Sequence, residues 1–170
     1  MTAAIGVIGC KNAGKTTLIE GLLKQFASRG LRVATIKHDA HDFEIDIPGK
    51  DTWRHRAAGS KLTIIASASK VALVRETEDE ATLANLLQFV DDSFDLVLVE
   101  GMRSSPLPKI LVQRPEAGDD PPGIQGTIIA VVSEGDDAGP REGLFRPDDA
   151  AALADLIQQR LLSNKEVMAV

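Results

Sequence analysis

The chain alternates between short apolar runs and longer stretches in which apolar residues recur every three or four positions. Short unbroken runs are typical of strands buried on both faces of a parallel sheet. Runs of this kind, with charged or polar residues mostly near their ends, occur at residues 3–8, 32–38, 94–101, 109–114 and 126–133. Helical spacing follows the first run, at Leu18, Ile19, Leu22, Leu23 and Phe26, and it recurs at 79–90 and 146–162. This alternation predicts a three-layer α/β domain with a largely parallel sheet.

Two strand-like runs, KLTIIAS and KVALVRE, follow one another almost directly at 61–76. Such a pair predicts an added antiparallel hairpin. A short helix is expected before it, at 52–59, capped by Asp51 and stopped at Gly59. Neither a linker nor an internal repeat appears, so a single domain is expected over residues 1–170.

A glycine-rich motif, G-C-K-N-A-G-K-T-T, lies between the first apolar run and the first helical stretch. Its pattern matches G-x-x-x-x-G-K-[ST], in which backbone N–H groups cradle phosphates at the start of a helix. Lys15 is expected to reach the β- and γ-phosphates, and the Thr16 hydroxyl to bind Mg²⁺. The fold is therefore predicted to be of the P-loop NTPase class. The predicted nucleotide-binding residues of this loop are Gly9, Lys11, Asn12, Ala13, Gly14, Lys15, Thr16 and Thr17.

The strand predicted at 94–101 ends in Glu100, followed by Gly101. P-loop proteins commonly place a carboxylate there to hold the water shell of Mg²⁺. Because ligands of parallel α/β sheets bind at the carboxyl ends of strands, Glu100 is expected to face the glycine-rich loop. Thr16 and Glu100 are the predicted metal-side residues, and Glu100 and Lys15 are predicted to be catalytic.

The polar segment 38–51 follows the second predicted strand and contains His38, His41 and five acids, of which Asp39, Asp42, Glu44 and Asp46 are the candidate metal ligands. A dedicated transition-metal site is one hypothesis. A switch loop that senses the γ-phosphate and Mg²⁺, with Asp39 or Asp46 as the reporting carboxylate, is the favoured one. Lys50 has two open interpretations: a turn lysine in water, or part of an anion site with Arg54 and Arg56.

Composition narrows the classes of partner. The 25 acids and 19 bases leave a formal charge of −6, and no basic stripe with interleaved aromatics occurs, so nucleic acid is not expected as a partner. No apolar run is long enough for a membrane span, and no leader-like segment is recognised. A single cysteine, Cys10, argues against a disulfide framework and favours a cytoplasmic protein.

The order of four segments resembles the MobB family, the molybdopterin-guanine dinucleotide biosynthesis adapter proteins. The segments are KNAGKTTLIEGLL, KH, DIPGKDTWRHRAAG and FDLVLVEGMRSSPLPKI. The resemblance implies a slowly hydrolysing, Mg²⁺-dependent GTP-binding protein, normally a homodimer. It also implies a role beside a MobA-type guanylyltransferase and molybdopterin-handling proteins. Carried over by position, the family's second signature comprises Asp46, Gly49, Lys50, Asp51 and Thr52, which adds Asp46 as a catalytic residue and Lys50 and Asp51 as binding residues.

Two other functions use the same loop. A small-molecule kinase or ATP-dependent ligase requires cations near an acceptor, for which the candidates are Lys37, Lys50, Arg54, Arg103 and Lys109. A partition-type ATPase requires a lysine where Cys10 stands, which argues against that class. No N-K-x-D guanine signature occurs, so only the resemblance favours GTP. If guanine is selected, the segment 131–137, with Glu134, Asp136 or Asp137, is expected to read the base.

Overall fold

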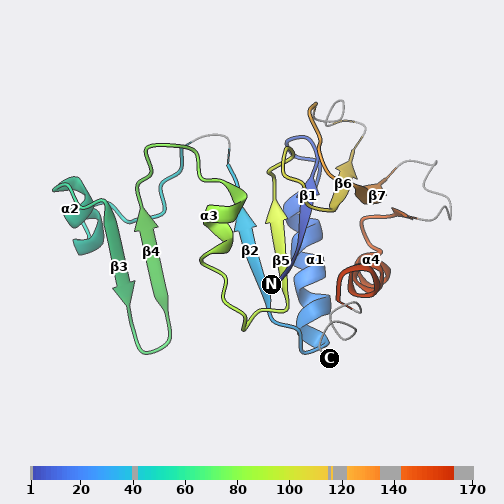
Figure 1. The fold of residues 1–170 in the computed structure, drawn as a ribbon, viewed down its shortest axis with the longest axis horizontal. Helices are drawn as coiled ribbons and strands as arrows, with labels where there is room; N and C mark the ends of the chain where they lie inside the picture. Colours follow the sequence, from blue (N-terminus) through green and yellow to red (C-terminus); the bar gives the residue numbers. More distant parts are fainter. Residues whose placement is uncertain (1, 40–41, 115, 117–121, 135–142, 163–170) are drawn as a thin grey trace. The chain divides into compact units, whose positions relative to one another are not determined.

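The protein is described by a computed structural model for residues 2–39, 42–114, 116, 122–134 and 143–162 (Figure 1). The residues group into two compact units, one formed by 1–38 with 83–170 and the other by 39–82. The expectation of a single domain over 1–170 stays a prediction.

The first unit is built on a six-stranded sheet in the order β2-β5-β1-β6-β7-β8, and every neighbouring pair is parallel. The predicted parallel sheet is therefore confirmed. The strand β8 was not anticipated, because two residues are too few to form a recognisable pattern. The strands are β1 (Ala3–Ile8), β2 (Val33–Lys37), β5 (Leu96–Glu100), β6 (Lys109–Gln113), β7 (Ile128–Ser133) and β8 (Leu144–Phe145).

The helices of this unit are α1 (Lys15–Ser28), α3 (Leu83–Leu87) and α4 (Ala150–Ile157), and a π-helical turn at Gln158–Leu162 follows α4. The expected extent of two helices was wrong. The helix α3 is short because Phe89 N and Val90 N bond to carbonyls three residues back, which tightens the chain into a turn. The helix α4 starts four residues later than expected. Asp149 there bonds through its carboxylate to Arg146 N and through its own N–H to Arg146 O, which forms a turn before the helix.

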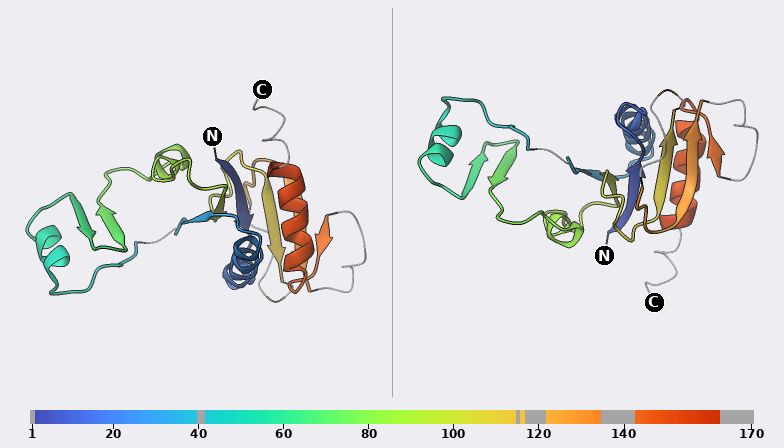
Figure 2. Two further views of the ribbon diagram at one scale, coloured as in Figure 1. Left: turned by 90° about the horizontal axis from the view of Figure 1, so that it is seen from below. Right: turned by 90° about the horizontal axis from the view of Figure 1, so that it is seen from above.

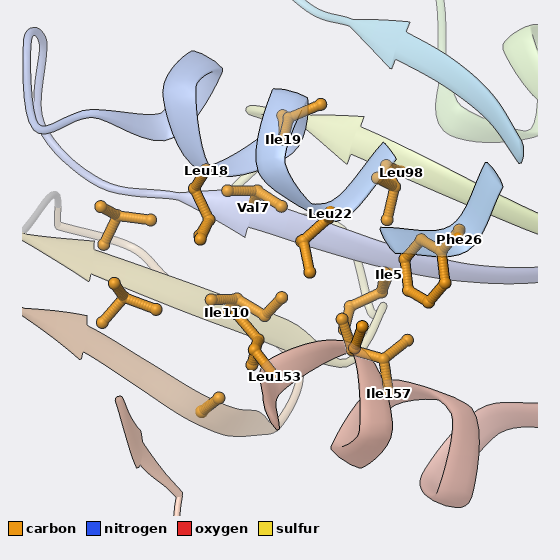
Figure 3. Packing of buried hydrophobic residues seen from close by; sticks show 14 of the residues in the cluster. Ile5, Val7, Leu18, Ile19, Leu22, Phe26, Leu98, Ile110, Leu153 and Ile157 are labelled. Carbon is orange, nitrogen blue, oxygen red and sulfur yellow. The ribbon is translucent and has the colours of Figure 1, made fainter. Parts of the chain in front are cut away.

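The helices α1 and α4 run beside the parallel strands and bury one face of the sheet (Figure 2). Figure 3 shows side chains from α1, such as Leu22 and Phe26, meeting Ile5 of β1 and Ile157 of α4, all 0% exposed. The two helices approach closely at Gly21, where an added Cβ would lie 3.2 Å from the Ala150 Cβ. This apolar layer fixes the strands whose ends carry the polar residues.

The opposite face of the sheet buries a lysine. Alternation along β6 places Lys109 on the other face from Ile110, and both side chains are 0% exposed. Lys109 Nζ donates to the carbonyl oxygens of Ser105 and Leu107, at 2.5 and 3.1 Å. Burial lowers the pKa of the Lys109 amine. These bonds fasten the connection from β5 to β6 to the strand that follows it.

The second unit contains the helix α2 (Asp51–Ala57) and the predicted hairpin, formed by β3 (Leu62–Ala66) and β4 (Val71–Arg75). Thr63 is buried, at 8% exposed, in a hairpin whose strand β3 packs with α2. The face opposite Thr63 is exposed and mostly apolar, with Arg75 at the end where it pairs with Leu62. It comprises Leu62, Ile64, Ala66, Val71 and Leu73, and is called here the hairpin's open face.

The hydropathy of the described helices also bears on membranes. Within the described ranges, none of the helices combines the length and the apolar character that crossing a bilayer requires.

Candidate phosphate-binding site

The glycine-rich motif forms the predicted turn between β1 and α1. Asn12 and Gly14 have positive φ values of 64° and 97°, and Leu18 N donates to Gly14 O at 3.0 Å to begin the helix. Gly9 is required by packing, since a Cβ at this position would lie 2.2 Å from Val112 O of β6. The strand, glycine loop and helix therefore follow one another as a phosphate cradle requires.

The Lys15 amine lies back over this loop. Its Nζ donates to Gly9 O at 3.1 Å and to Cys10 O at 2.7 Å. Both acceptors belong to the loop itself, so the ammonium charge is held where phosphate oxygens are expected. Exchanging these two carbonyl contacts for the oxygens of a triphosphate would bring the ammonium an oppositely charged partner.

A threonine and a glutamate from distant parts of the sequence meet beside the loop. Thr16 Oγ1 lies 3.2 and 3.3 Å from the two carboxylate oxygens of Glu100, although the residues are 84 positions apart. The sheet explains the meeting, because β1 and β5 are parallel neighbours and Val7 pairs with Glu100. Thr16 is exposed, so this hydroxyl–carboxylate pair is open to a cation from solvent. Oxygen donors of this kind suit Mg²⁺.

The turn after Glu100 is held to the same strand. Gly101 N donates to Val7 O at 3.0 Å, and both Gly101 and Met102 have positive φ, at 93° and 52°. A Cβ on Gly101 would lie 3.0 Å from His38 O, at the end of β2. The glycine therefore allows the ends of β2 and β5 to approach closely. As predicted, the carboxyl ends of β1, β2 and β5 share one edge of the sheet.

Predicted site residues of the second unit have partners within that unit. Asp46 Oδ1 accepts from Thr52 Oγ1 at 2.7 Å and from Ile47 N at 3.1 Å, while Arg56 Nη1 lies 3.7 Å from Asp46 Oδ2. Asp46 thus braces the turn that leads into α2. This helix begins at Asp51, not after it, and Lys50 is the N-cap residue, which corrects the expected cap.

The two arginines of α2, Arg54 and Arg56, lie near acidic side chains. Arg56 Nη1 donates to Glu44 at 2.9 Å, and this hydrogen bond raises the pKa of Arg56. Arg54 Nη1 lies 3.8 Å from Asp51, on the exposed side of α2. Lys50 is exposed at the start of the helix. An anion site shared by Lys50, Arg54 and Arg56 stays a prediction, as do the binding roles of Lys50 and Asp51.

The described residues offer no cluster of ligands for the hypothesised transition-metal site. In the described residues, no group of three or more His, Cys, Asp or Glu side chains is arranged to hold a metal ion. His41 lies outside the described residues, as do Asp136 and Asp137 of the expected base-reading segment. Glu134 of that segment is described, with its carboxylate bonded to Arg114.

Sequence reasoning missed Arg114, and it named Lys109 only as a candidate cation beside a kinase acceptor, whereas the Lys109 side chain is 0% exposed. Arg114 directly follows β6 and, with Glu134, lines a cavity of about 90 Å³ beside the glycine-rich loop. A polar residue that ends a buried strand was the signal that had already identified Glu100, and it applies equally to Arg114. Lys109 sits inside the pattern of a buried strand, and only the fold shows which carbonyls its amine meets.

A parallel sheet with a glycine-rich loop after its first strand, and with a carboxylate at the end of the neighbouring strand, defines a P-loop α/β protein. The family model described as MobB, "Molybdopterin guanine dinucleotide synthesis protein B", matches residues 4–134. The chain belongs to this MobB family.

Individual relatives agree with this assignment. The chain is 40% identical over 130 residues to a molybdopterin-guanine dinucleotide biosynthesis adapter protein from Haemophilus influenzae, covering 76% of this chain and 73% of the relative. It is 41% identical over 128 residues to the protein of that name from Escherichia coli, covering 71% and 72%. The crystal structure of Bacillus subtilis MobB is similar with a TM-score of 0.71 and 30% identity, covering 94% of this chain and 98% of that one.

Proposed function

We propose that this chain is an adapter in molybdopterin guanine dinucleotide biosynthesis that binds GTP with Mg²⁺ and hydrolyses it slowly. Membership of the MobB family supports the pathway, and the curated relatives carry the name adapter protein. The glycine-rich loop supports the triphosphate. Guanine is favoured over adenine by the same family relationship.

The meeting of Thr16 and Glu100 is the observation that carries the proposal. A phosphate loop alone fits many anions, whereas a hydroxyl and a carboxylate 3.2 Å apart beside it fit the metal side of a nucleotide site. In the proposed complex Thr16 and Glu100 would be the residues that hold Mg²⁺. The metal supplies charge neutralisation at the phosphates. Lys15 exchanges its loop carbonyls for the β- and γ-phosphates, and residues 9–17 surround them.

The proposed role of Glu100 in Mg²⁺ binding is tested with Glu100→Gln, which keeps the size of the side chain and removes its charge. The midpoint for Mg²⁺ in GTP turnover should rise, and added Mg²⁺ should partly restore the rate. Nucleotide affinity without metal should stay level or rise, because a negative charge near the phosphates is gone. Turnover and GTP binding are measured across a Mg²⁺ titration.

Two further variants are compared with Glu100→Gln to separate an effect on Mg²⁺ from effects on hydrolysis or on triphosphate binding. Asp46→Asn changes a residue bonded to Thr52 in the second unit, and it should alter hydrolysis with a smaller effect on the Mg²⁺ midpoint. Lys15→Ala should weaken triphosphate binding at every Mg²⁺ concentration while the fold is kept. An unchanged midpoint and rate in Glu100→Gln would leave Glu100 as an ordinary strand-end carboxylate.

A homodimer is part of the proposal, and the hairpin's open face supports it. Ile64 is 56% exposed and Val71 is 71% exposed, on one face of a two-stranded sheet whose strand β3 contacts α2. Isolated hairpins are marginally stable, and exposed apolar strands favour pairing. A second copy of the chain is the proposed occupant of this face. Light scattering at micromolar concentration should give the mass of a dimer, and a monomer mass would contradict it.

The proposed partners are a MobA-type guanylyltransferase and molybdopterin-handling proteins, met in the cytoplasm. GTP turnover is compared with and without such an enzyme and molybdopterin, and stimulation by the pair is expected. Phosphoryl transfer to a small-molecule acceptor would instead support the kinase or ligase alternative.

A further inference from the structure

A cavity of about 90 Å³ adjoins the phosphate loop at the carboxyl ends of β6 and β7. Gly14 and Thr17 form its side toward the loop and the first turn of α1. Gln113, Arg114 and Glu134 supply its polar groups, and Pro147 lies among its apolar walls. A nucleotide whose phosphates occupy the loop would therefore have this cavity within reach.

Two of the polar groups are joined to each other. Arg114 Nη2 donates to Glu134 Oε1, and both side chains are partly exposed, at 38% and 45%. The Nε of Arg114 is buried and, among the described residues, has no hydrogen-bond partner. A buried donor without a partner is costly, so its position favours a ligand that offers an acceptor.

This arrangement presents one carboxylate and one spare N–H donor beside apolar walls. The edge of guanine carries two adjacent donors, N1–H and the 2-amino group, followed by the O6 acceptor. A carboxylate can accept from both donors, and an arginine N–H can donate to O6 or N7. Adenine has no adjacent pair of donors, so it leaves one carboxylate oxygen unpaired.

We propose that this cavity receives the guanine base and that Glu134 selects it through N1–H and the 2-amino group. The inference rests on the proposed nucleotide-binding function and adds to it the residues that choose the base. Arg114 donates to the base from the opposite side. A site that bonds a particular donor disfavours analogues that lack this donor, because one hydrogen bond to the carboxylate is then lost.

The closed ion pair must open for this to happen. In the closed pair the Glu134 carboxylate already accepts from Arg114 Nη2, so it meets the donors of a base fully only when this bond is released. Arg114 therefore swings away from Glu134 as the base enters, and the carboxylate exchanges a guanidinium partner for the donors of the base. Because the pair is partly exposed, opening it is inexpensive.

The experiment compares GTP, ITP and ATP, since ITP differs from GTP only in lacking the 2-amino group. Dissociation constants are measured with Mg²⁺ for the full chain, for Glu134→Ala and for Glu134→Gln. The unmodified chain should bind GTP about tenfold or more tightly than ITP, the effect of one hydrogen bond to a charged group. Glu134→Ala should remove this ratio and leave ATP affinity within about twofold. Glu134→Gln should lie between the two, because the amide has one acceptor oxygen.

Glu20→Ala is the matched control, because Glu20 is an exposed acid on α1 outside the cavity and its removal should leave all three affinities unchanged. Equal binding of GTP and ITP by the unmodified chain would overturn the inference, and so would an unchanged ratio in Glu134→Ala. In both cases the proposed function would still stand if the unmodified chain binds triphosphate and Lys15→Ala loses this binding. If no triphosphate binds the unmodified chain, both proposals fail together.

Discussion

The two units differ in how far they bury their apolar side chains. In the first unit Phe26 and Leu98 are 0% exposed between the sheet and its helices. In the second unit Phe43 is 72% exposed and Ile64 is 56% exposed. A sheet of six strands has enough width to hold a core beneath two helices, whereas two strands and one short helix do not. The first unit therefore has a closed core of its own, whereas the second leaves large apolar side chains exposed.

The largest effect is expected from a pair of phenylalanine substitutions, one in each unit. Phe26→Ala should lower the free energy of unfolding by about 3–5 kcal/mol, because it empties a fully buried position. Phe43→Ala should change it by less than about 0.5 kcal/mol in the monomer, because the ring is already in solvent. Denaturant unfolding of both variants measures the contrast. Similar losses in the two would show that the second unit buries Phe43 in solution.

A smaller effect is expected at Lys109, the buried lysine of the first unit. Lys109→Met keeps the length of the stem and should cost about 1–3 kcal/mol, since the carbonyls of Ser105 and Leu107 lose their donor. The connection that follows Glu100 would be less firmly held. Urea unfolding at neutral pH measures this loss, and a variant as stable as the parent would show that the amine is dispensable.

The difference in stability between the parent protein and Lys109→Met should depend on pH in a definite direction. Burial lowers the pKa of Lys109 in the folded state below the ordinary 10.5 of the unfolded chain. Between these two pKa values the unfolded state binds more protons, so stability rises with pH in that window. The parent should therefore gain stability relative to Lys109→Met as pH approaches 10.5. A parallel pH profile for the two proteins would contradict a buried, desolvated amine.

The smallest change in monomer stability is expected on the hairpin, where two neighbouring isoleucines have equal exposure. Ile64 lies on the open face and Ile65 on the opposite face with Thr63, and each is 56% exposed. Ile64→Thr should leave monomer stability within about 0.5 kcal/mol and weaken dimerisation about tenfold or more, through lost apolar burial. Ile65→Thr should leave dimerisation closer to that of the parent. Sedimentation across a concentration series compares them, and equal dimer strength in both variants would remove the open face from the interface.

Much of the first unit was predictable because each of its signals is local. The apolar runs at 3–8 and 109–114 have no polar interruption before their ends, apart from Lys109, so they could only be buried strands. The loop motif carries its own turn chemistry in glycines that no other residue can replace. The extent of α3 and α4 was harder to predict, because their ends depend on single hydrogen bonds such as that between Asp149 and Arg146.

Residue types and their spacing determined the parallel sheet, the hairpin, the phosphate loop and the choice of Glu100 as its partner. Tertiary structure alone decided which distant groups meet. Thr16 reaches Glu100 across 84 positions because β1 and β5 are neighbours in the sheet, and Arg114 reaches Glu134 because β6 and β7 are. Strand order also placed the Lys109 stem against Gly6, where a Cβ would lie 3.2 Å from Lys109 Cγ. Local sequence patterns do not reveal such contacts, because the order of the strands depends on hydrophobic burial throughout the whole core.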